Sequence, residues 1–181
     1  MAKVDRRIAK SQEAIKKAVL ELMSEKDFNQ ITIQDISDRA NVSRKTIYLH
    51  YMDKYDLLDK LIEEHINELQ ILCESSAEMD FIDGNTVWFE YLESNYLFFS
   101  TMLESKGAPS FRRQFLEFVI EQLEAEVNIS EGKNQGLSKD IILRFIGGAY
   151  VEEIEWWFKN EMPYPPRVMA EQVGILIERI L

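Results

Sequence analysis

The spacing of apolar side chains predicts three helices before residue 54. The segment from Arg6 to Lys26 carries its apolar residues on one face, and neither Gly nor Pro interrupts it. From Ile33 to Ala40 the apolar residues lie three and four positions apart, and polar residues take the opposite face. A third helix, from Arg44 to His50, buries Ile47. The pattern therefore predicts three helices around a small core.

The residues around the second and third helices favour a tight turn between them. Thr32 is a natural N-cap, and Asp35, three positions later, completes a capping-box pattern. Asn41 tolerates the left-handed conformation of a sharp helix end, and Ser43 is suited to cap the next helix. These features predict a helix-turn-helix, whose second helix fits the major groove of DNA. A surface helix with ordinary solvated charges is the alternative interpretation.

Three motifs follow one another through this region. They are T-I-x-D-I from Thr32, V-S-x-x-T-I-Y-x-H-Y from Val42 and D-K-x-x-L-L from Asp53. With these motifs, residues 15–58 closely resemble the N-terminal DNA-binding domain of the TetR family of bacterial transcriptional regulators. Asn41 and Asp27 stand where that family commonly has Gly, but both residue types enter the left-handed region with little difficulty.

The resemblance implies two sets of contacts with double-stranded DNA. The residues expected at base edges are Gln34, Arg44, Lys45 and Tyr48, and those expected to hold phosphates are Thr32, Ser43, Thr46, His50 and Lys54. Tyr48 suits either role. Arg and Lys match guanine O6 and N7, whereas hydroxyl groups match phosphate oxygens. The resemblance also implies a near-palindromic operator, with one half-site for each subunit of a dimer.

Apolar spacing predicts helices over most of the remaining chain. A long helix begins at Lys54 and runs to about Glu78. Further helices are expected at residues 111–127, 139–160 and 166–181. The polar segment 128–138 is expected to be a mobile loop. The predicted fold class is all-α, with a helix-turn-helix domain at residues 1–53 and a helical ligand-binding and dimerisation domain at residues 54–181.

The segment from Thr86 to Leu103 is unusually rich in aromatic residues. Aromatic rings line pockets for small molecules and also fill protein cores, so both interpretations remain open. The candidates for binding a small-molecule effector are His65, Trp88, Tyr91, Tyr96, Phe99, Phe115 and Phe118.

The last two helices are apolar on more than one face and therefore need cover on both sides. Gly147 and Gly148 lie inside one of them, where Gly usually permits close approach of another helix. We expect the two helices to pair with their copies in a homodimer. The residues predicted at this interface are Ile146, Gly147, Tyr150, Ile154, Val173 and Ile177. The C-terminal region is also similar to a TetR subgroup that includes activators of dihydroxyacetone kinase operons.

The charge distribution is more informative than the net charge of −11. Residues 1–54 carry 11 basic and 8 acidic side chains, whereas residues 55–181 carry 10 basic and 24 acidic ones. A chain that is basic only at one end can place that end on phosphate. The single cysteine, Cys73, is expected in the core and suits a reducing cytoplasm, and no apolar run is long enough for a membrane span.

The sequence contains none of the common catalytic or metal-binding motifs. It has two His residues, and it lacks H-E-x-x-H, G-x-S-x-G and Cys/His metal spacing. We therefore predict no enzyme activity, no cofactor and no metal. The predicted function is a dimeric transcriptional repressor that a small-molecule effector releases from DNA. The alternative is a module whose body docks a partner protein in an activator complex.

Overall fold

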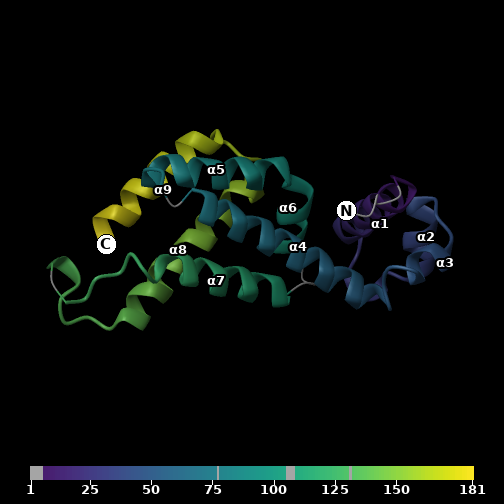
Figure 1. The fold of residues 1–181 in the computed structure, drawn as a ribbon, viewed down its shortest axis with the longest axis horizontal. Helices are drawn as coiled ribbons and strands as arrows, with labels where there is room; N and C mark the ends of the chain where they lie inside the picture. Colours follow the sequence, from purple (N-terminus) through teal and green to yellow (C-terminus); the bar gives the residue numbers. More distant parts are fainter. Residues whose placement is uncertain (1–5, 77, 105–108, 131) are drawn as a thin grey trace. The chain divides into compact units, whose positions relative to one another are not determined.

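The computed structural model describes residues 6–76, 78–104, 109–130 and 132–181. Within these ranges the chain is helical and contains no strand, which confirms the all-α prediction (Figure 1). Contacts between Cα atoms divide the chain into two compact units. We call the first the head, which comprises the described residues up to His65 together with Pro109. The second is the body, which comprises the described residues of 66–104 and 110–181.

The head contains the three helices that the apolar pattern predicts. They are α1 (Arg6–Glu25), α2 (Ile33–Ala40) and α3 (Arg44–Tyr48), and a 3₁₀ turn, η1 (Phe28–Gln30), precedes α2. The long helix α4 (Lys54–Ser75) contributes its first half to the head and its second half to the body. The head core consists of fully buried apolar side chains from all four helices, including Ile15, Val19, Ile36, Ile47 and Leu57.

Side-chain caps determine where the head helices begin and end. Thr32 and Asp35 form the predicted capping box, and Asn41 is left-handed, with a φ of 52°. Asp27, by contrast, is not left-handed: its φ is −55°, and its carboxylate accepts a hydrogen bond from the Asn29 backbone N–H at 2.8 Å. The left-handed conformation expected at Asp27 was therefore wrong, because this side chain caps η1 instead.

The body is built from aromatic packing. Its helices after α4 are α5 (Phe81–Ser94), α6 (Tyr96–Glu104), α7 (Pro109–Leu123), α8 (Lys139–Lys159) and α9 (Pro166–Ile180). Helix α5 lies beside α9, and α6 packs against α8 (Figure 1). Phe99 is fully buried, and its ring lies 4.9 Å from that of Phe98 and 6.0 Å from that of Phe115. The Phe99 ring also stacks on that of Phe158 in α8, at 6.3 Å, so ring contacts hold together helices that are distant in the sequence.

The segment 128–138 is anchored where we predicted a mobile loop. It contains a 3₁₀ turn, η2 (Gly132–Asn134), and Asn134 is buried. The Asn134 amide donates to the carbonyls of Ile180 and Leu181, and Lys133 donates to those of Glu178 and Arg179. These donors satisfy carbonyls at the end of α9 that have no partner within the helix. The loop thus serves as the C-terminal cap of α9.

No helix in the described part of the chain is long and apolar enough to cross a membrane.

Candidate nucleic-acid interface and body cavity

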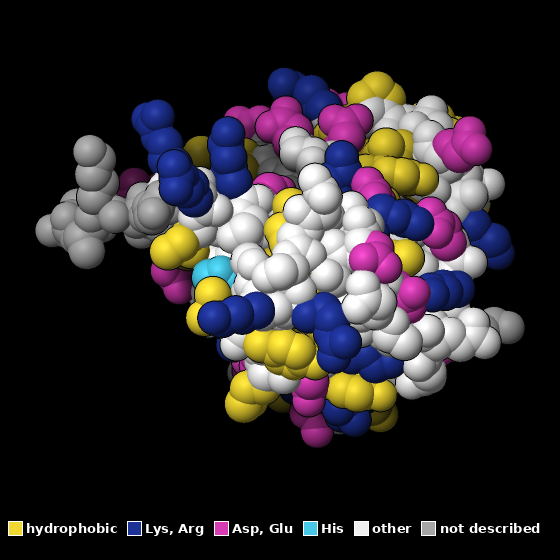
Figure 2. All heavy atoms as spheres, turned by 90° about the vertical axis from the view of Figure 1, so that its right-hand side faces the viewer, with side chains coloured by type: hydrophobic (Ala, Val, Ile, Leu, Met, Phe, Trp, Pro, Cys, Tyr) yellow, Lys and Arg dark blue, Asp and Glu magenta, His cyan; other side chains and the backbone are white. Residues whose placement is uncertain are grey.

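Helix α3 presents three uncommitted side chains on the surface of the head. Arg44, Lys45 and Tyr48 are exposed, and Tyr48 retains 51% of its accessible surface. None of the three forms a hydrogen bond or ion pair with another described residue. Figure 2 views the side of the head that carries α2 and α3, where Lys and Arg side chains lie among hydrophobic ones. The end of the head thus offers free cationic and hydroxyl donors to an acceptor outside the chain.

Helix α3 has only five residues, too few to be stable alone. Two kinds of contact with the rest of the head hold α3 in place: one at its inner face and one in the turn before it. Ile47 is fully buried in the head core. The Ser37 hydroxyl donates to the Val42 carbonyl at 2.6 Å, which fixes the turn between α2 and α3. The geometry is therefore a braced helix with its outer face free, as a helix-turn-helix requires.

The hydroxyl groups that we predicted to contact phosphates already form hydrogen bonds within the head. Ser43 Oγ accepts from the Thr46 backbone N–H at 3.1 Å and shares a 2.8 Å hydrogen bond with Thr46 Oγ1. One hydroxyl hydrogen of this pair remains free to donate to a phosphate. Thr32 differs, because its hydroxyl donates to the Asp35 carboxylate at 2.9 Å. The Thr32 hydroxyl therefore has no hydrogen left for a phosphate, and its observed role is that of a cap.

Lys54 points into the head and does not fit its predicted role at a phosphate. Its ammonium donates to the carbonyls of Phe28, Asn29 and Ile31 at 2.9, 3.0 and 2.8 Å. An ammonium has three N–H donors, so all of them are used within the chain. The ammonium also lies 4.9 Å from the centre of the Phe28 ring. Lys54 thus ties the start of α4 to η1, a long-range contact that the sequence pattern did not reveal.

The other two predicted DNA contacts remain at the surface of the head. The exposed Gln34 donates one amide hydrogen to Asp38 at 2.7 Å, which leaves its second amide hydrogen and its carbonyl available. His50 is half-buried, and its ring packs edge-on against that of Tyr51. Two exposed apolar side chains that we did not predict, Leu49 and Met52, follow α3.

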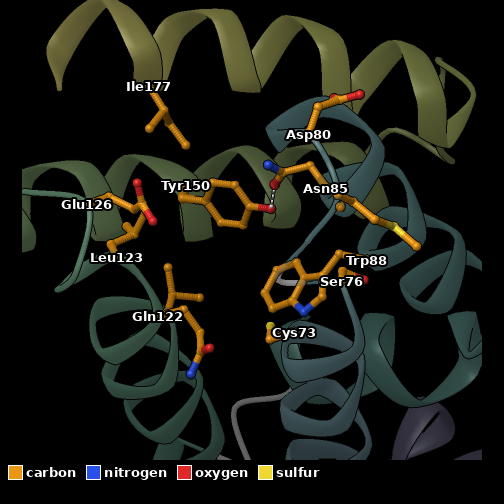
Figure 3. Close-up of a pocket in the computed structure, with 13 residues that line it drawn as sticks. Cys73, Ser76, Asp80, Asn85, Trp88, Gln122, Leu123, Glu126, Tyr150 and Ile177 are labelled. Atoms are coloured by element: carbon orange, nitrogen blue, oxygen red, sulfur yellow. Dashed lines mark hydrogen bonds between the residues drawn. The ribbon is translucent and has the colours of Figure 1, made fainter.

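The body contains a cavity of about 520 Å³ (Figure 3). Helix α4, the start of α5, the end of α7, α8 and α9 all contribute to its wall. The residues that matter for its chemistry are Cys73, Asn85, Trp88, Gln122, Glu126 and Tyr150. The volume suits a small organic molecule.

Only Trp88 among the predicted effector-binding residues lines this cavity. Phe99, Phe115 and Phe118 are buried in the aromatic core, and neither Tyr91 nor Tyr96 reaches the wall. His65 belongs to the head unit, and burial lowers its pKa to about 4. The prediction was wrong for these six residues as cavity-lining groups, because aromatic composition does not distinguish core rings from pocket rings.

Hydrogen bonding and burial define the interior of the cavity. The Tyr150 hydroxyl donates to Asn85 Oδ1 at 2.9 Å, and burial raises the pKa of Tyr150, so its phenol stays neutral. Burial also raises the pKa of the Cys73 thiol, and the nearby Trp88 indole partly offsets that rise. The buried indole N–H of Trp88 has no hydrogen-bond partner among the described residues. The wall therefore contains a donor that a bound molecule can satisfy.

The residues predicted at the dimer interface face the core of their own body. Tyr150 lines the cavity, and Gly147 lies so close to α7 that an added Cβ would stand 2.9 Å from Ile120 Cγ1. The other four, which are Ile146, Ile154, Val173 and Ile177, are buried as well. Side chains buried within one chain cannot cover a second, so this residue assignment was wrong.

A different face of the same two helices is apolar and uncovered. Ile141 and Phe145 on α8 are 70% and 67% exposed, and Leu176 on α9 is 54% exposed. A Cβ added at Gly148 would meet no atom within 4 Å. We refer to Ile141, Phe145, Gly148 and Leu176 as the α8/α9 outer face. These helices thus carry exposed apolar side chains as well as buried ones, and the exposed residues differ from those predicted at the interface.

No cluster of His, Cys, Asp or Glu in the described ranges has the geometry of a metal site.

Comparisons with known proteins agree with this division into head and body. A family model described as "Bacterial regulatory proteins, tetR family" matches residues 15–61. A second, described as "Transcriptional regulator C-terminal region", matches residues 80–179. A solved structure of a TetR transcriptional regulator from Streptococcus agalactiae 2603V superposes with a TM-score of 0.72. The two chains are 25% identical, and the superposition covers 96% of each.

Two relatives match parts of the chain. The Bacillus subtilis (strain 168) protein "Uncharacterized HTH-type transcriptional regulator YxbF" is 40% identical over 67 residues, which are 36% of this chain and 18% of that protein. The Lactococcus lactis subsp. lactis (strain IL1403) protein "HTH-type dhaKLM operon transcriptional activator DhaS" is 27% identical over 89 residues. That match covers 49% of this chain and 46% of DhaS, so the chain spans less than half of either relative. Taken with the two family models, these matches establish that the chain belongs to the TetR family of bacterial transcriptional regulators.

Proposed function

We propose that this protein binds a specific DNA sequence as a homodimer and represses transcription from it. The observation that supports this most is the set of free donors on α3, Arg44, Lys45 and Tyr48. With α3 in the major groove, these side chains and Gln34 approach base edges. Ser43, Thr46 and His50 flank them and contact phosphates. Thr32 and Lys54 have structural roles and are not part of this interface.

The second subunit covers the α8/α9 outer face. Phe145 and Leu176 are large apolar side chains that are 67% and 54% exposed, and Gly148, one turn after Phe145 on α8, leaves room for a second helix to come close. Two copies of this face related by a two-fold axis form a four-helix interface. Each subunit then supplies one α3 to one half-site of a near-palindromic operator.

A small molecule in the body cavity relieves repression. Cys73 in the last turn of α4 and Ser76 just after it both line the cavity, and the same helix begins in the head at Lys54. Helix α4 is therefore a direct covalent route from the cavity to the head. A ligand that prefers the DNA-incompetent form tenfold shifts the DNA-binding equilibrium by about 1.4 kcal/mol.

The similarity to DhaS, named as an activator, supports a second candidate function. In this case the body docks a partner protein, and the complex activates transcription. Reconstituted transcription from the protein's own upstream region distinguishes the two. The purified protein alone lowers transcription if it is a repressor, whereas an activator raises it only together with its partner.

DNA binding by α3 is tested by fluorescence anisotropy on that upstream DNA and on random DNA. Lys45→Ala is expected to lose about 1–3 kcal/mol on the specific site and much less on random DNA. The matched control is Lys159→Ala, which removes one exposed positive charge from α8 in the body. Equal losses for both variants, or equal losses on both DNAs for Lys45→Ala, would contradict the proposed role of α3.

The dimer is tested by sedimentation at micromolar concentration. Phe145→Glu is expected to give a monomer with an unchanged helical circular dichroism spectrum and weak operator binding. Leu137→Glu, at an apolar residue that is 55% exposed in the loop before α8, is the control and is expected to remain dimeric. A Phe145→Glu protein that remains dimeric would exclude the α8/α9 outer face as the interface.

A further inference from the structure

Among the described residues, the wall of the body cavity contains carboxylates but no basic side chain. Of those residues, Asp80 and Glu126 are the charged ones that line it, and the other polar groups of the lining are uncharged. An anion placed there would meet two negative charges in the lining. The lining therefore discriminates by charge before it discriminates by shape.

The two carboxylates differ in the number of hydrogen bonds and nearby positive charges that compensate their negative charge. Asp80 caps α5, where its carboxylate accepts from the backbone N–H groups of Ile82 and Asp83, each at 3.0 Å. These hydrogen bonds and nearby Arg167 lower the pKa of Asp80. Glu126, by contrast, forms no hydrogen bond or ion pair through its carboxylate with any described residue. Glu126 is exposed, so its charge lies on the solvent side of the cavity wall without a partner among the described residues.

The Glu126 carboxylate lies on the side of the cavity where the Tyr150 ring stands (Figure 3). The Trp88 ring lies beside that of Tyr150, with the ring centres 5.5 Å apart (Figure 3). The lining also contains the apolar side chains of Val119 and Leu123. Rings and an unpaired carboxylate together favour a positively charged group, and an apolar wall favours a hydrocarbon or aromatic body.

A second observation independently indicates a ligand. Trp88 is only 7% exposed, yet its indole N–H lacks a hydrogen-bond partner among the described residues. The nitrogen faces the Cys73 sulfur, which is only a weak acceptor (Figure 3). Leaving a buried donor unsatisfied costs free energy, so a ligand with an acceptor near this nitrogen gains affinity.

We propose that the body cavity selects a small organic cation, an amine or quaternary ammonium on an apolar, ring-bearing body, with Glu126 as its counter-ion. This inference rests on the proposed effector site and adds the ligand's chemical class. Trp88 donates its indole N–H to an acceptor on the ligand. Anions of similar size, including acyl chains that end in phosphate or carboxylate, are rejected.

The test uses three probes of one shape in isothermal calorimetry with the full chain and no DNA. They are 4-benzamidobutyl-trimethylammonium, its neutral tert-butyl analogue and 4-benzamidobutyl sulfonate, and each carries the same amide oxygen as an acceptor for the Trp88 indole N–H. The cation is expected to bind at least tenfold more tightly than the sulfonate. Tighter binding of the sulfonate, equal binding of both ions, or no binding of any probe at millimolar concentration would each overturn the proposal.

Substitution of Glu126 locates the cation. Glu126→Gln keeps the size of the side chain and is expected to weaken cation binding five- to tenfold, while affinity for the neutral analogue stays unchanged. Glu117→Gln removes a similar exposed charge from α7 outside the cavity and is the matched control. A Glu126→Gln protein that binds the cation as well as the wild type would exclude Glu126 as the counter-ion.

The readouts separate this inference from the proposed function. Calorimetry without DNA measures the charge preference of the cavity alone, whereas anisotropy on the upstream DNA measures release. A cation that binds through Glu126 without releasing DNA would overturn the cavity's role as effector site and leave the ligand class intact.

Discussion

Different kinds of contact stabilise the interior of the head and the interior of the body. In the head, polar side chains fix the backbone: Thr32 and Asp35 start α2, Ser43 starts α3, and Lys54 joins three carbonyls near η1. In the body, stacked and edge-on ring pairs, such as Phe99 with Phe158 and Phe89 with Trp157, connect helices that are distant in the sequence. The head thus adds directional hydrogen bonds at its helix ends to a small apolar core, whereas the body relies mainly on buried rings.

This difference fits the role proposed for each unit. A recognition helix must stand at a fixed angle with its outer side chains free, and hydrogen-bonded caps hold such an angle. A ligand cavity needs walls whose shape changes when a molecule enters, and ring contacts can slide without breaking hydrogen bonds. A substitution that removes one contact of either kind should therefore affect the stability of one unit more than that of the other.

The largest effect is expected from Phe99→Ala in the body. Phe99 is fully buried and contacts rings from α6, α7 and α8, so its removal leaves a large cavity. Truncation of such a ring costs about 3–5 kcal/mol. Amide hydrogen exchange is expected to show lost protection in the body, with protection in α2 little changed. Tyr48→Ala, at an exposed ring on α3, is the control and is expected to change stability by less than about 0.5 kcal/mol. Equal loss of protection in both units would show that the head has no stability of its own.

The same contrast explains which features the sequence could predict. Caps link residues that are three positions apart, as Thr32 and Asp35 are, so the head helices were predicted nearly to the residue. Lys54 Nζ contacts the carbonyl of Phe28, 26 positions away, and no local pattern encodes that contact. For the same reason, apolar spacing predicted that α8 has two apolar faces but could not tell which one the body covers.

Most of the residues that line the cavity could not be predicted from the sequence. Its lining joins Cys73 on α4, Asn85 on α5, Gln122 on α7 and Tyr150 on α8, and it takes shape only when these helices pack. A search for aromatic side chains found Trp88 and missed the polar ones. Polar residues at otherwise apolar helix positions, such as Asn85 and Gln122, were the signal that could have located it.

Lys54→Met is expected to destabilise the head by about 1–3 kcal/mol, because it leaves three carbonyls without their donor. Loss of operator affinity should follow from unfolding, so the slope of log affinity against log salt should stay that of the wild type. Lys45→Met is the matched comparison: it should preserve stability and reduce that slope by about 1 if Lys45 neutralises a phosphate as well as reading a base. A smaller salt slope for Lys54→Met with unchanged stability would restore Lys54 as a phosphate contact.

The adjacent glycines of α8 test how the body covers one face and leaves the other. In Gly147→Ala the new Cβ would meet Ile120 of α7 at 2.9 Å, and such overpacking costs about 1–3 kcal/mol, less about 1 kcal/mol of gained helix propensity. Gly148→Ala meets nothing within 4 Å, so urea unfolding of the monomeric Phe145→Glu background should show a gain of up to about 1 kcal/mol. In the protein that retains Phe145, Gly148→Ala should instead weaken the dimer. The same sign for both substitutions in the monomer would contradict the assignment of inner and outer faces.

The smallest effect concerns the hydrogen-bonded cap of α2 and appears as a pH dependence. Hydrogen bonds from the Thr32 backbone, the Lys26 ammonium and the Thr32 hydroxyl lower the pKa of Asp35 from 3.8 to about 2. Because the folded pKa is the lower one, Asp35 stabilises the head fully above pH 3.8, and this stabilisation disappears as the pH falls towards 2. The difference in unfolding free energy between the wild type and Asp35→Asn should therefore shrink over that interval. Thr32→Ala should lose about 1 kcal/mol near neutral pH and should raise the pKa of Asp35, measured by NMR titration of its carboxyl. A constant difference between pH 5 and pH 2 would mean that the Asp35 charge contributes nothing to the cap, and the head would then depend on apolar packing as the body does.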